Sequence, residues 1–274
     1  MVQGPWYLST VEILVAQHLA QPEDGFGLQQ ALLEEVASGS RSPTALLWTS
    51  SRYVGATHLE TRLASFGAAA RLAEKNAFPV LVRNSGGGAV AANDGSISFS
   101  LTFRVEDLRH GLYERYAEGA ELVVSALKSL GVAAEAGDVE GEFCPGAYSV
   151  RAGGPLGIKI AGLAQRVTRR AARLEALVLV TRTAELKGIL ELFYGTLGIP
   201  FCPESVADIP ETDVPKTMEA LTEAVWARYG AREANLGEET FVRARALRER
   251  WRATPGASGR ISHSLRGGAA DATG

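Results

Sequence analysis

The stretch that decides the fold runs over Gly141–Arg166 and reads GEFCPGAYSVRAGGPLGIKIAGLAQR. It places Cys144 in a Cys-Pro-Gly turn and Lys159 on a short apolar strand, with the glycine- and proline-rich segment Arg151–Gly157 between them. Such a segment predicts a reversal of the chain that brings the thiol and the amine together. Because a neighbouring ammonium favours the thiolate, which is the nucleophilic form of cysteine, the pair predicts a covalent acyl-transfer site.

Structural roles compete with this interpretation of both residues. A lone free cysteine is most often a small buried hydrophobe, and a lysine such as Lys159 is often a surface charge at a strand edge. The apolar neighbours of Lys159 and its proximity to Cys144 favour the catalytic roles. Cys202 also precedes a proline but has no matching lysine, so we expect it to pack in a core or a loop.

Composition and charge narrow the class of protein. With 274 residues, 46% apolar and 22% charged, the chain can form one large or two small domains with a buried core. A net charge of −3 argues against general nucleic-acid binding. The two cysteines fit a reducing compartment, and neither apolar stretch, 11–20 or 177–180, reads as a signal peptide or a membrane span. We therefore expect a cytoplasmic protein without nucleic-acid or membrane partners.

The hydrophobic periodicity predicts a mixture of strands and helices. Strands are expected over 44–48, 53–55, 79–82, 97–103, 132–135, 158–167 and 174–181, and helices over 26–38, 58–76, 111–130, 186–197, 217–229 and 238–251. Segment 11–19 is ambiguous and is compatible with a helix. The strands 158–167 and 174–181 should form an antiparallel hairpin around a basic turn. The class is therefore α+β, with a mixed, largely antiparallel sheet and packed helices.

Domain boundaries follow from the same pattern. We expect one catalytic domain over residues 1–252, with a helical part from about residue 186, and a disordered tail over 253–274 that is rich in Gly, Ala and Ser. Strand 97–103 alternates four large apolar side chains with small hydroxyls. The hydroxyl face suits a sheet side that leaves room for a ligand, but in isolation we expect it to be solvated. The four histidines are scattered without ligand spacing, so no metal site is expected.

Three consecutive glycines lie between two expected strands, in the stretch Arg83-Asn84-Ser85-Gly86-Gly87-Gly88-Ala89-Val90. Each glycine costs backbone entropy, so the run is a poor choice for stability alone. It is useful where a group must approach the main chain closely and contact its bare N–H groups. A flexible hairpin connection is the alternative, and the flanking Arg83 and Ser85 make the two interpretations about equal.

Two stretches together resemble the lipoate-protein ligase and octanoyltransferase superfamily. Residues 82–90 resemble its Arg-x-Ser-Gly-Gly-Gly-Ala motif, and residues 158–166 resemble its Lys-(Ile/Val)-x-Gly-x-(Ala/Ser)-(Gln/Tyr)-Arg motif, in the same order and at a similar separation. The resemblance covers roughly residues 26–181 and implies the biotin/lipoate-protein-ligase-like α+β fold, of the class II aminoacyl-tRNA synthetase type. It implies that the acyl substrate is bound by Arg83, Ser85, Gly86, Gly87, Gly88, Gly162 and Ala164.

The Cys-Pro-Gly-x-Tyr pattern at Cys144, with Lys159 on the next strand, is similar to the cysteine-lysine octanoyltransferases. The nearest branch moves an octanoyl or lipoyl group from the glycine-cleavage H protein to lipoyl domains such as those of 2-oxoacid dehydrogenases. The resemblance implies that Cys144 forms an acyl-cysteine thioester and that an acceptor lysine attacks it. Lys159 would bind the carbonyl and manage a proton. The acyl chain would lie beside residues 85–90, and no cofactor is required.

Two alternatives remain. An ATP-dependent lipoate-protein ligase would need ATP and Mg²⁺ and would tolerate the loss of Cys144. Its motif often continues with an aromatic residue and a histidine, where this chain has Ala91-Ala92, but the region after residue 181 has the length of the accessory subdomain that ligases carry. A non-catalytic homologue that binds lipoyl domains is the second alternative. The arginines at 166, 169, 170 and 173 are expected in a solvated turn, where they could also steer an acidic carrier.

Overall fold

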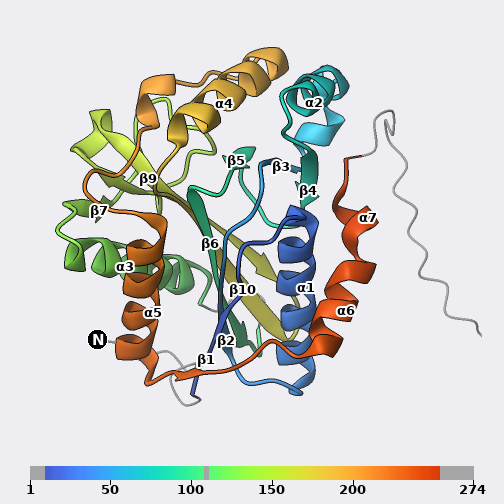
Figure 1. Cartoon of the computed structure of the whole chain (residues 1–274), viewed down its shortest axis with the longest axis vertical. Helices are drawn as coiled ribbons and strands as arrows, with labels where there is room; N and C mark the ends of the chain where they lie inside the picture. Colours follow the sequence, from blue (N-terminus) through green and yellow to red (C-terminus); the bar gives the residue numbers. More distant parts are fainter. Residues whose placement is uncertain (1–9, 108–110, 254–274) are drawn as a thin grey trace, which may run out of the picture.

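An eight-stranded sheet crosses the molecule, in the computed structural model that describes residues 10–107 and 111–253 (Figure 1). Its order is β11-β1-β2-β6-β10-β9-β8-β7. The bounds are β1 (Glu12–Val15), β2 (Thr44–Trp48), β6 (Ser96–Arg104), β7 (Ala134–Ala136), β8 (Val150–Ala152), β9 (Ile158–Val167), β10 (Ala171–Leu179) and β11 (Arg232–Glu233). Strand β1 is parallel to both its neighbours and the other pairs are antiparallel, which confirms the predicted mixed sheet and the β9–β10 hairpin.

A second, three-stranded sheet has the order β4-β3-β5, with β3 (Tyr53–Thr57), β4 (Val80–Arg83) and β5 (Val90–Ala92). The glycine run connects β4 to β5. The helices α2 (Phe66–Lys75) and α4 (Thr183–Leu197) pack against this sheet, in a cluster that also contains Phe143 and Cys144 (Figure 1). The cysteine turn therefore lies where the small sheet meets the edge of the large one.

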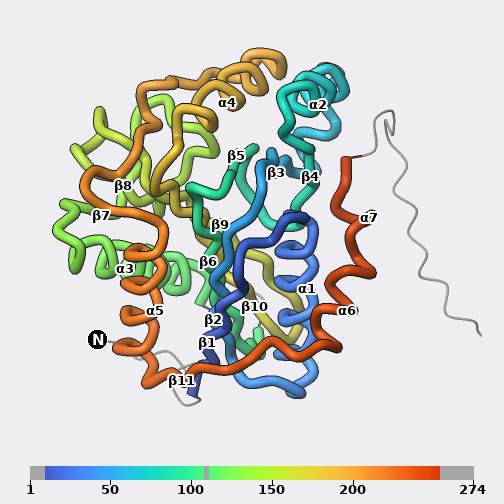
Figure 2. The backbone as a smooth tube through the Cα atoms, in the orientation of Figure 1, coloured from blue at the N-terminus to red at the C-terminus, as the bar shows by residue number. Residues whose placement is uncertain are grey.

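Helices cover both faces of the large sheet. On one face, α3 (Leu112–Ser129) packs on β9 and β10, and α5 (Val214–Tyr229) packs on α3 and on the apolar side of β6. On the other face, α1 (Pro22–Ser38) packs together with α6 (Glu238–Ala246) and α7 (Arg248–Trp251). Figure 2 shows that the C-terminal part of the chain returns to the N-terminal part, with β11 beside β1 and α6 beside α1.

The hydroxyl face of β6 is buried, so the expectation of a solvated face was wrong. Ser96, Ser98, Ser100 and Thr102 are each at most 8% exposed. The physical reason is that α1 lies across this face and packs on β6 and β10. Small side chains on the sheet and Gly25 on the helix permit this approach, because a side chain on Gly25 would overlap the ring of Trp48.

Two predicted elements differ from the structure. Segment 11–19 contains the strand β1 instead of a helix, because Glu12–Val15 pairs with β2 on one side and β11 on the other. Segment 58–76 is not one helix: a 3-10 turn, η2 (Glu60–Arg62), precedes α2, and Leu59 and Leu63 are 69% and 40% exposed. The carboxylate of Glu60 accepts the N–H of Thr57 and so bends the chain at this point.

The helical part expected from about residue 186 begins at Thr183 and contains α4 to α7 with the short strand β11. Residues 254–274 of the expected tail lie outside the described residues. Ala253 donates its N–H to the carbonyl of Val80, and Arg252 forms a bridge with Leu81, so both residues lie along the edge of β4. Among the described helices, none is both long enough and apolar enough to cross a bilayer.

Candidate active site around Cys144

Cys144 has a backbone conformation that is unusual for a residue with a side chain. Its φ is +44°, in the left-handed region, and it is 8% exposed. Such a conformation costs about 1–3 kcal/mol and persists only where the surroundings enforce it. The N–H of Cys144 donates to the hydroxyl of Tyr194 at 2.9 Å, and its carbonyl accepts from Lys159 at 2.9 Å. Both sides of the cysteine backbone are therefore fixed.

Lys159 is fully buried beside the cysteine, as the predicted chain reversal requires and contrary to the surface-charge alternative. Its Nζ donates to Glu142 Oε1 at 3.0 Å, to the Phe143 carbonyl at 2.8 Å and to the Cys144 carbonyl. An ammonium has three donors, and these three contacts use all of them. Burial lowers the pKa of Lys159, and the nearby Cys144 and Glu142 oppose this shift. In this geometry the lysine orients the turn through its oxygens.

Glu142 is the counter-charge of Lys159, and sequence reasoning did not identify it. Its side chain also accepts from Ser149 Oγ at 2.6 Å, from the N–H of Val139 at 3.0 Å and from that of Gly146 at 3.2 Å. One carboxylate thus ties both ends of the cysteine turn to the lysine. The available signal was the apolar strand around Lys159, because a buried ammonium requires a partner of opposite charge.

The hydrogen bonds to the sulfur come from the glycine-rich stretch. The N–H of Gly88 lies 3.1 Å from Cys144 Sγ, and Arg83 Nη2 lies 3.6 Å from it. A backbone donor and a guanidinium both favour negative charge on the sulfur. The structure therefore places two donors against the sulfur, one at the end of β4 and one on the loop that follows it, in addition to the buried lysine beneath the turn.

The glycine run allows this close approach. Gly87 has a φ of +97°, and a Cβ at this position would lie 2.6 Å from Cys144 Sγ. A Cβ on Gly88 would lie 3.1 Å from the Tyr194 hydroxyl, whereas one on Gly86 would meet no atom within 4 Å. Of the two interpretations of the run, the geometry favours the functional one, and the group that approaches the main chain is the cysteine of the same molecule.

Ser85 lies beneath the loop, in a buried polar network. Arg83 Nη1 donates to Ser85 Oγ at 2.8 Å, and Ser85 in turn donates to Glu175. Arg173 also pairs with Glu175, at 3.0 Å, and is 3% exposed, so this arginine is part of the network rather than of a solvated turn. The network fixes the guanidinium that faces the sulfur.

A narrow cavity of about 50 Å³ lies against Cys144. Three of the predicted substrate-binding residues, Arg83, Gly162 and Ala164, line it. Of the segment 85–90, which we expected beside the acyl chain, only Val90 lines the cavity. The other lining residues are Phe26, Gln29, Trp48, Tyr53, Ser98, Leu163, Glu175 and Ala176. The β6 hydroxyl Ser98 and Tyr53, the first residue of β3, thus line this cavity. The small hydroxyls of β6 were the signal in the sequence for Ser98, whereas no signal pointed to Tyr53.

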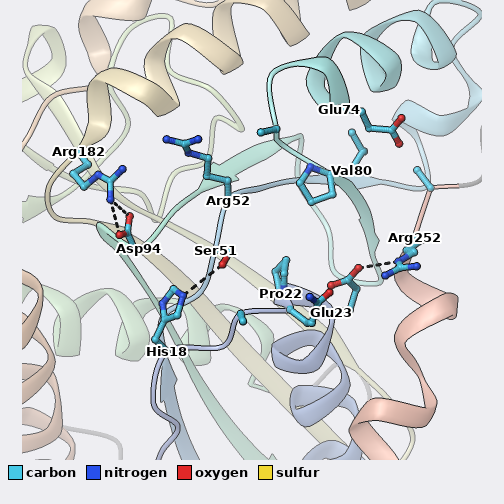
Figure 3. A pocket seen from close by; sticks show the side chains of 15 residues that line it. His18, Pro22, Glu23, Ser51, Arg52, Glu74, Val80, Asp94, Arg182 and Arg252 are labelled. Carbon is cyan, nitrogen blue, oxygen red and sulfur yellow. Dashed lines mark hydrogen bonds and ion pairs between the residues drawn. The ribbon is translucent and has the colours of Figure 1, made fainter.

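A larger cleft, of about 710 Å³, lies between the start of α1, the residues that precede β3 and the start of β4, and does not include Cys144 (Figure 3). Its charged side chains are largely paired with one another: Arg182 with Asp94, and Arg252 with Glu23. Within the described residues, no group of three or more His, Cys, Asp or Glu side chains could hold a metal ion. Cys144 and the groups that donate to its sulfur therefore lie at the smaller cavity.

The site thus combines a buried cysteine with two hydrogen-bond donors to its sulfur, beside the three-stranded sheet. Residues 21–226 match the family described as the lipoyl protein ligase A/B catalytic domain, and the chain belongs to this family. An octanoyl-[GcvH]:protein N-octanoyltransferase of Bacillus velezensis is 28% identical over 202 residues, which are 73% of this chain and 69% of the relative. One of Geobacillus kaustophilus is 30% identical over 151 residues, or 55% and 52% of the two chains.

Solved structures support the fold. A putative lipoate protein ligase from T. acidophilum with bound lipoic acid superposes with a TM-score of 0.70 at 20% identity and covers 88% of this chain and 95% of its own. A lipoate-protein ligase A bound with ATP gives a TM-score of 0.69 at 21% identity and covers 88% and 94%. At this level of identity the likeness shows a shared α+β fold, as predicted from the two motifs.

Proposed function

We propose that this protein transfers an octanoyl or lipoyl group to a lysine of lipoyl carrier domains through an acyl-cysteine thioester on Cys144. The observation that carries the proposal is the strained Cys144 whose sulfur accepts the Gly88 N–H at 3.1 Å. The relatives named as octanoyl-[GcvH]:protein N-octanoyltransferases support the acyl group and the class of partner. The glycine-cleavage H protein and the lipoyl domains of 2-oxoacid dehydrogenases are the proposed partners.

The reaction has two steps. In the first, the Cys144 thiolate attacks the acyl carbonyl of the donor; a C–S bond forms, the C–N bond to the carrier lysine breaks, and the leaving amine takes up a proton. In the second, the acceptor lysine attacks the thioester; a C–N bond forms, the C–S bond breaks, and the acceptor amine releases a proton. The protons balance over the two steps, and the thiolate is regenerated without a cofactor.

The proposal gives the Gly88 N–H, which contacts the sulfur at 3.1 Å, a role during these steps. When the sulfur becomes acylated it loses its negative charge, so the N–H is released for the oxygen of the tetrahedral intermediate. Lys159 binds the carbonyl of Cys144 in the structure, and its three protons are all held by oxygens. The proposed proton transfer by Lys159 therefore requires it to give up one of these contacts, and the shift of its pKa to lower values favours this.

Intact-protein mass spectrometry tests the proposal. The native chain is mixed with octanoylated H protein without ATP, beside a Cys144→Ala variant. We expect an octanoyl adduct on the native chain that is removed by hydroxylamine and is absent from the variant. A cytoplasmic location is part of the same proposal, because the carriers are expected there.

Three outcomes separate the proposal from its alternatives. Modification of an acceptor domain only when lipoate, ATP and Mg²⁺ are present, with the Cys144→Ala variant still active, would identify a ligase. Binding of the carrier without an adduct or a modified acceptor would identify a non-catalytic binding protein. An adduct that persists on the variant would remove Cys144 as the nucleophile.

A further inference from the structure

We infer that Tyr194 is a positioning residue for Cys144 and that it acts by fixing the Gly88 N–H against the sulfur. The inference rests on the proposed function only in that Cys144 is the nucleophile. It concerns a residue of α4, in the helical part of the chain that follows both sequence motifs. Nothing in its local sequence, Leu192-Phe193-Tyr194, distinguishes it from a core aromatic residue.

One hydroxyl joins two segments that are distant in sequence. Tyr194 Oη accepts the N–H of Cys144 at 2.9 Å and donates to the carbonyl of Ala89 at 2.8 Å. The side chain is 3% exposed, and its ring packs against Phe201 with a centroid separation of 5.6 Å. The hydroxyl therefore holds the cysteine turn and the glycine-rich loop at a fixed separation.

Side chains also bind the other backbone polar groups of Gly88 and Ala89 in the glycine-rich loop. Arg83 Nη2 donates to the Gly88 carbonyl at 2.6 Å, and Glu60 Oε1 accepts the Ala89 N–H at 2.6 Å. With Tyr194 on the Ala89 carbonyl, three of the four backbone polar groups of Gly88 and Ala89 are bound by side chains of three different elements. We call this arrangement the clamp. The fourth group, the Gly88 N–H, is aimed at Cys144 Sγ.

The chemistry of the phenol suits this role. Burial raises the pKa of Tyr194, so the hydroxyl is neutral near neutral pH and can accept and donate at the same time. Without the hydroxyl, the Cys144 N–H and the Ala89 carbonyl both lose a buried partner. The strained backbone of Cys144 is then free to relax, and the sulfur moves away from the Gly88 N–H.

The test measures the reactivity of the thiol and needs no acyl donor. Rates of Cys144 alkylation by iodoacetamide are followed against pH by peptide-resolved mass spectrometry, so that Cys202 is scored separately. Because the sulfur loses its hydrogen bond from the Gly88 N–H, Tyr194→Phe should move the rate profile to higher pH and slow alkylation near neutral pH about fivefold to tenfold.

Tyr229→Phe is the matched control. It removes a comparable hydroxyl, which donates to Glu118 at 2.7 Å from α5, on the other side of the molecule's core. We expect its alkylation profile to match that of the native chain. A Tyr194→Phe variant that loses thermal stability but keeps the native pH profile would overturn the inference and reduce Tyr194 to a packing residue.

A second variant covers the case in which Tyr194→Phe does not fold. Glu60→Gln disturbs the clamp from the opposite side, because one amide NH₂ replaces an oxygen that accepts Ala89 or Thr57. It should move the profile in the same direction, and an unchanged profile would contradict the clamp. If Tyr194→Phe alters the alkylation profile but the native chain forms no acyl adduct, the proposed function is wrong and the inference on Tyr194 stands.

Discussion

Gly87 is the residue at which the site depends most directly on the absence of a side chain. Its φ of +97° disfavours any L-residue with a Cβ, and that Cβ would lie 2.6 Å from the cysteine sulfur. We predict that Gly87→Ala lowers the rate of Cys144 alkylation more than about tenfold, since the sulfur must leave the Gly88 N–H. The rate is measured at constant pH with the same reagent.

Gly86→Ala is the control for this substitution. It lies one residue earlier in the same loop, and its added Cβ would meet no atom within 4 Å. Its alkylation rate should stay within about twofold of the native rate. Equal effects of the two substitutions would show that loop flexibility, and not the approach of the sulfur, explains the glycine run.

Lys159 gives a prediction about stability. Lys159→Met leaves the buried carboxylate of Glu142 without its counter-charge, and breaking a buried pair in this way costs about 3–5 kcal/mol. Urea denaturation should show a correspondingly lower midpoint. The double variant Glu142→Gln/Lys159→Met removes both charges and should recover part of the loss. Equal stability of the native chain and Lys159→Met would mean that the pair does not support the turn.

At this scale the sequence identified some partners and missed others. The glycine- and proline-rich segment between Cys144 and Lys159 was sufficient to predict that they meet, because β8 and β9 pair across it. It did not indicate that the ammonium contacts oxygens of the turn while the sulfur accepts from Gly88. Tyr194 and Glu60 could not be predicted, because each becomes a partner only when three distant elements pack together.

Among the helices, α4 is anchored at its start by an exposed cluster of charges. Glu185 lies in the first turn and pairs with Arg52 at 2.7 Å and with Arg182 at 2.6 Å. Hydrogen bonds from Arg52 and then Arg182 lower its pKa from 4.5 to about 2. A carboxylate whose pKa is lower in the folded state stabilises the fold at any pH above its pKa in the unfolded chain. This contribution disappears as the pH falls through its pKa in the folded state.

We therefore predict that Glu185→Gln is less stable than the native chain near neutral pH, by less than about 1 kcal/mol because the pairs are exposed. The difference should be complete above pH 4.5 and vanish towards pH 2. Chemical denaturation at a series of pH values measures it. A difference that stays constant down to pH 2 would show that packing, and not charge, accounts for it.

Helices and strands were predictable where a single hydrophobic period dominated the sequence of the segment. The bounds of β2 agree with the predicted strand at both ends, and the β9–β10 hairpin was expected from its two apolar runs. The prediction failed where tertiary contacts decide the structure. Glu60 turns inward and interrupts an otherwise helical pattern, and α1 covers a strand face that is polar enough to be exposed.

At the scale of the whole molecule, the C-terminal helices α6 and α7 complete the core by packing against α1. Trp251 is 2% exposed in the cluster with α1, and Arg248 forms two hydrogen bonds of 2.6 Å with Asp24. We propose that the folded domain extends through this region, to about residue 252. A chain ending at residue 253 should keep the native stability. A chain ending at residue 237 lacks α6 and α7, so part of the core is exposed, and its free energy of unfolding should fall by more than about 3 kcal/mol.

Thermal unfolding and urea denaturation of the two shortened chains check this expectation. The alkylation rate of Cys144 is also measured on both chains. It reports on the site separately from the overall stability, because α6 and α7 cover α1 and not the cysteine itself. Native-like stability of the shorter chain would place the end of the domain before α6. A loss of stability in the chain ending at 253 would show that later residues belong to the domain.

The edge of β4 has a consequence for the order in which the site is completed during biosynthesis. Arg252 and Ala253 pair with Leu81 and Val80, on the strand that leads directly into Arg83. The chain is synthesised from its N-terminus, so about 170 further residues must be translated after β4 before its outer edge can be covered. Until then this edge, close to Arg83, is open to pairing with other strands. We therefore expect the nascent chain to need protection by a chaperone late in translation.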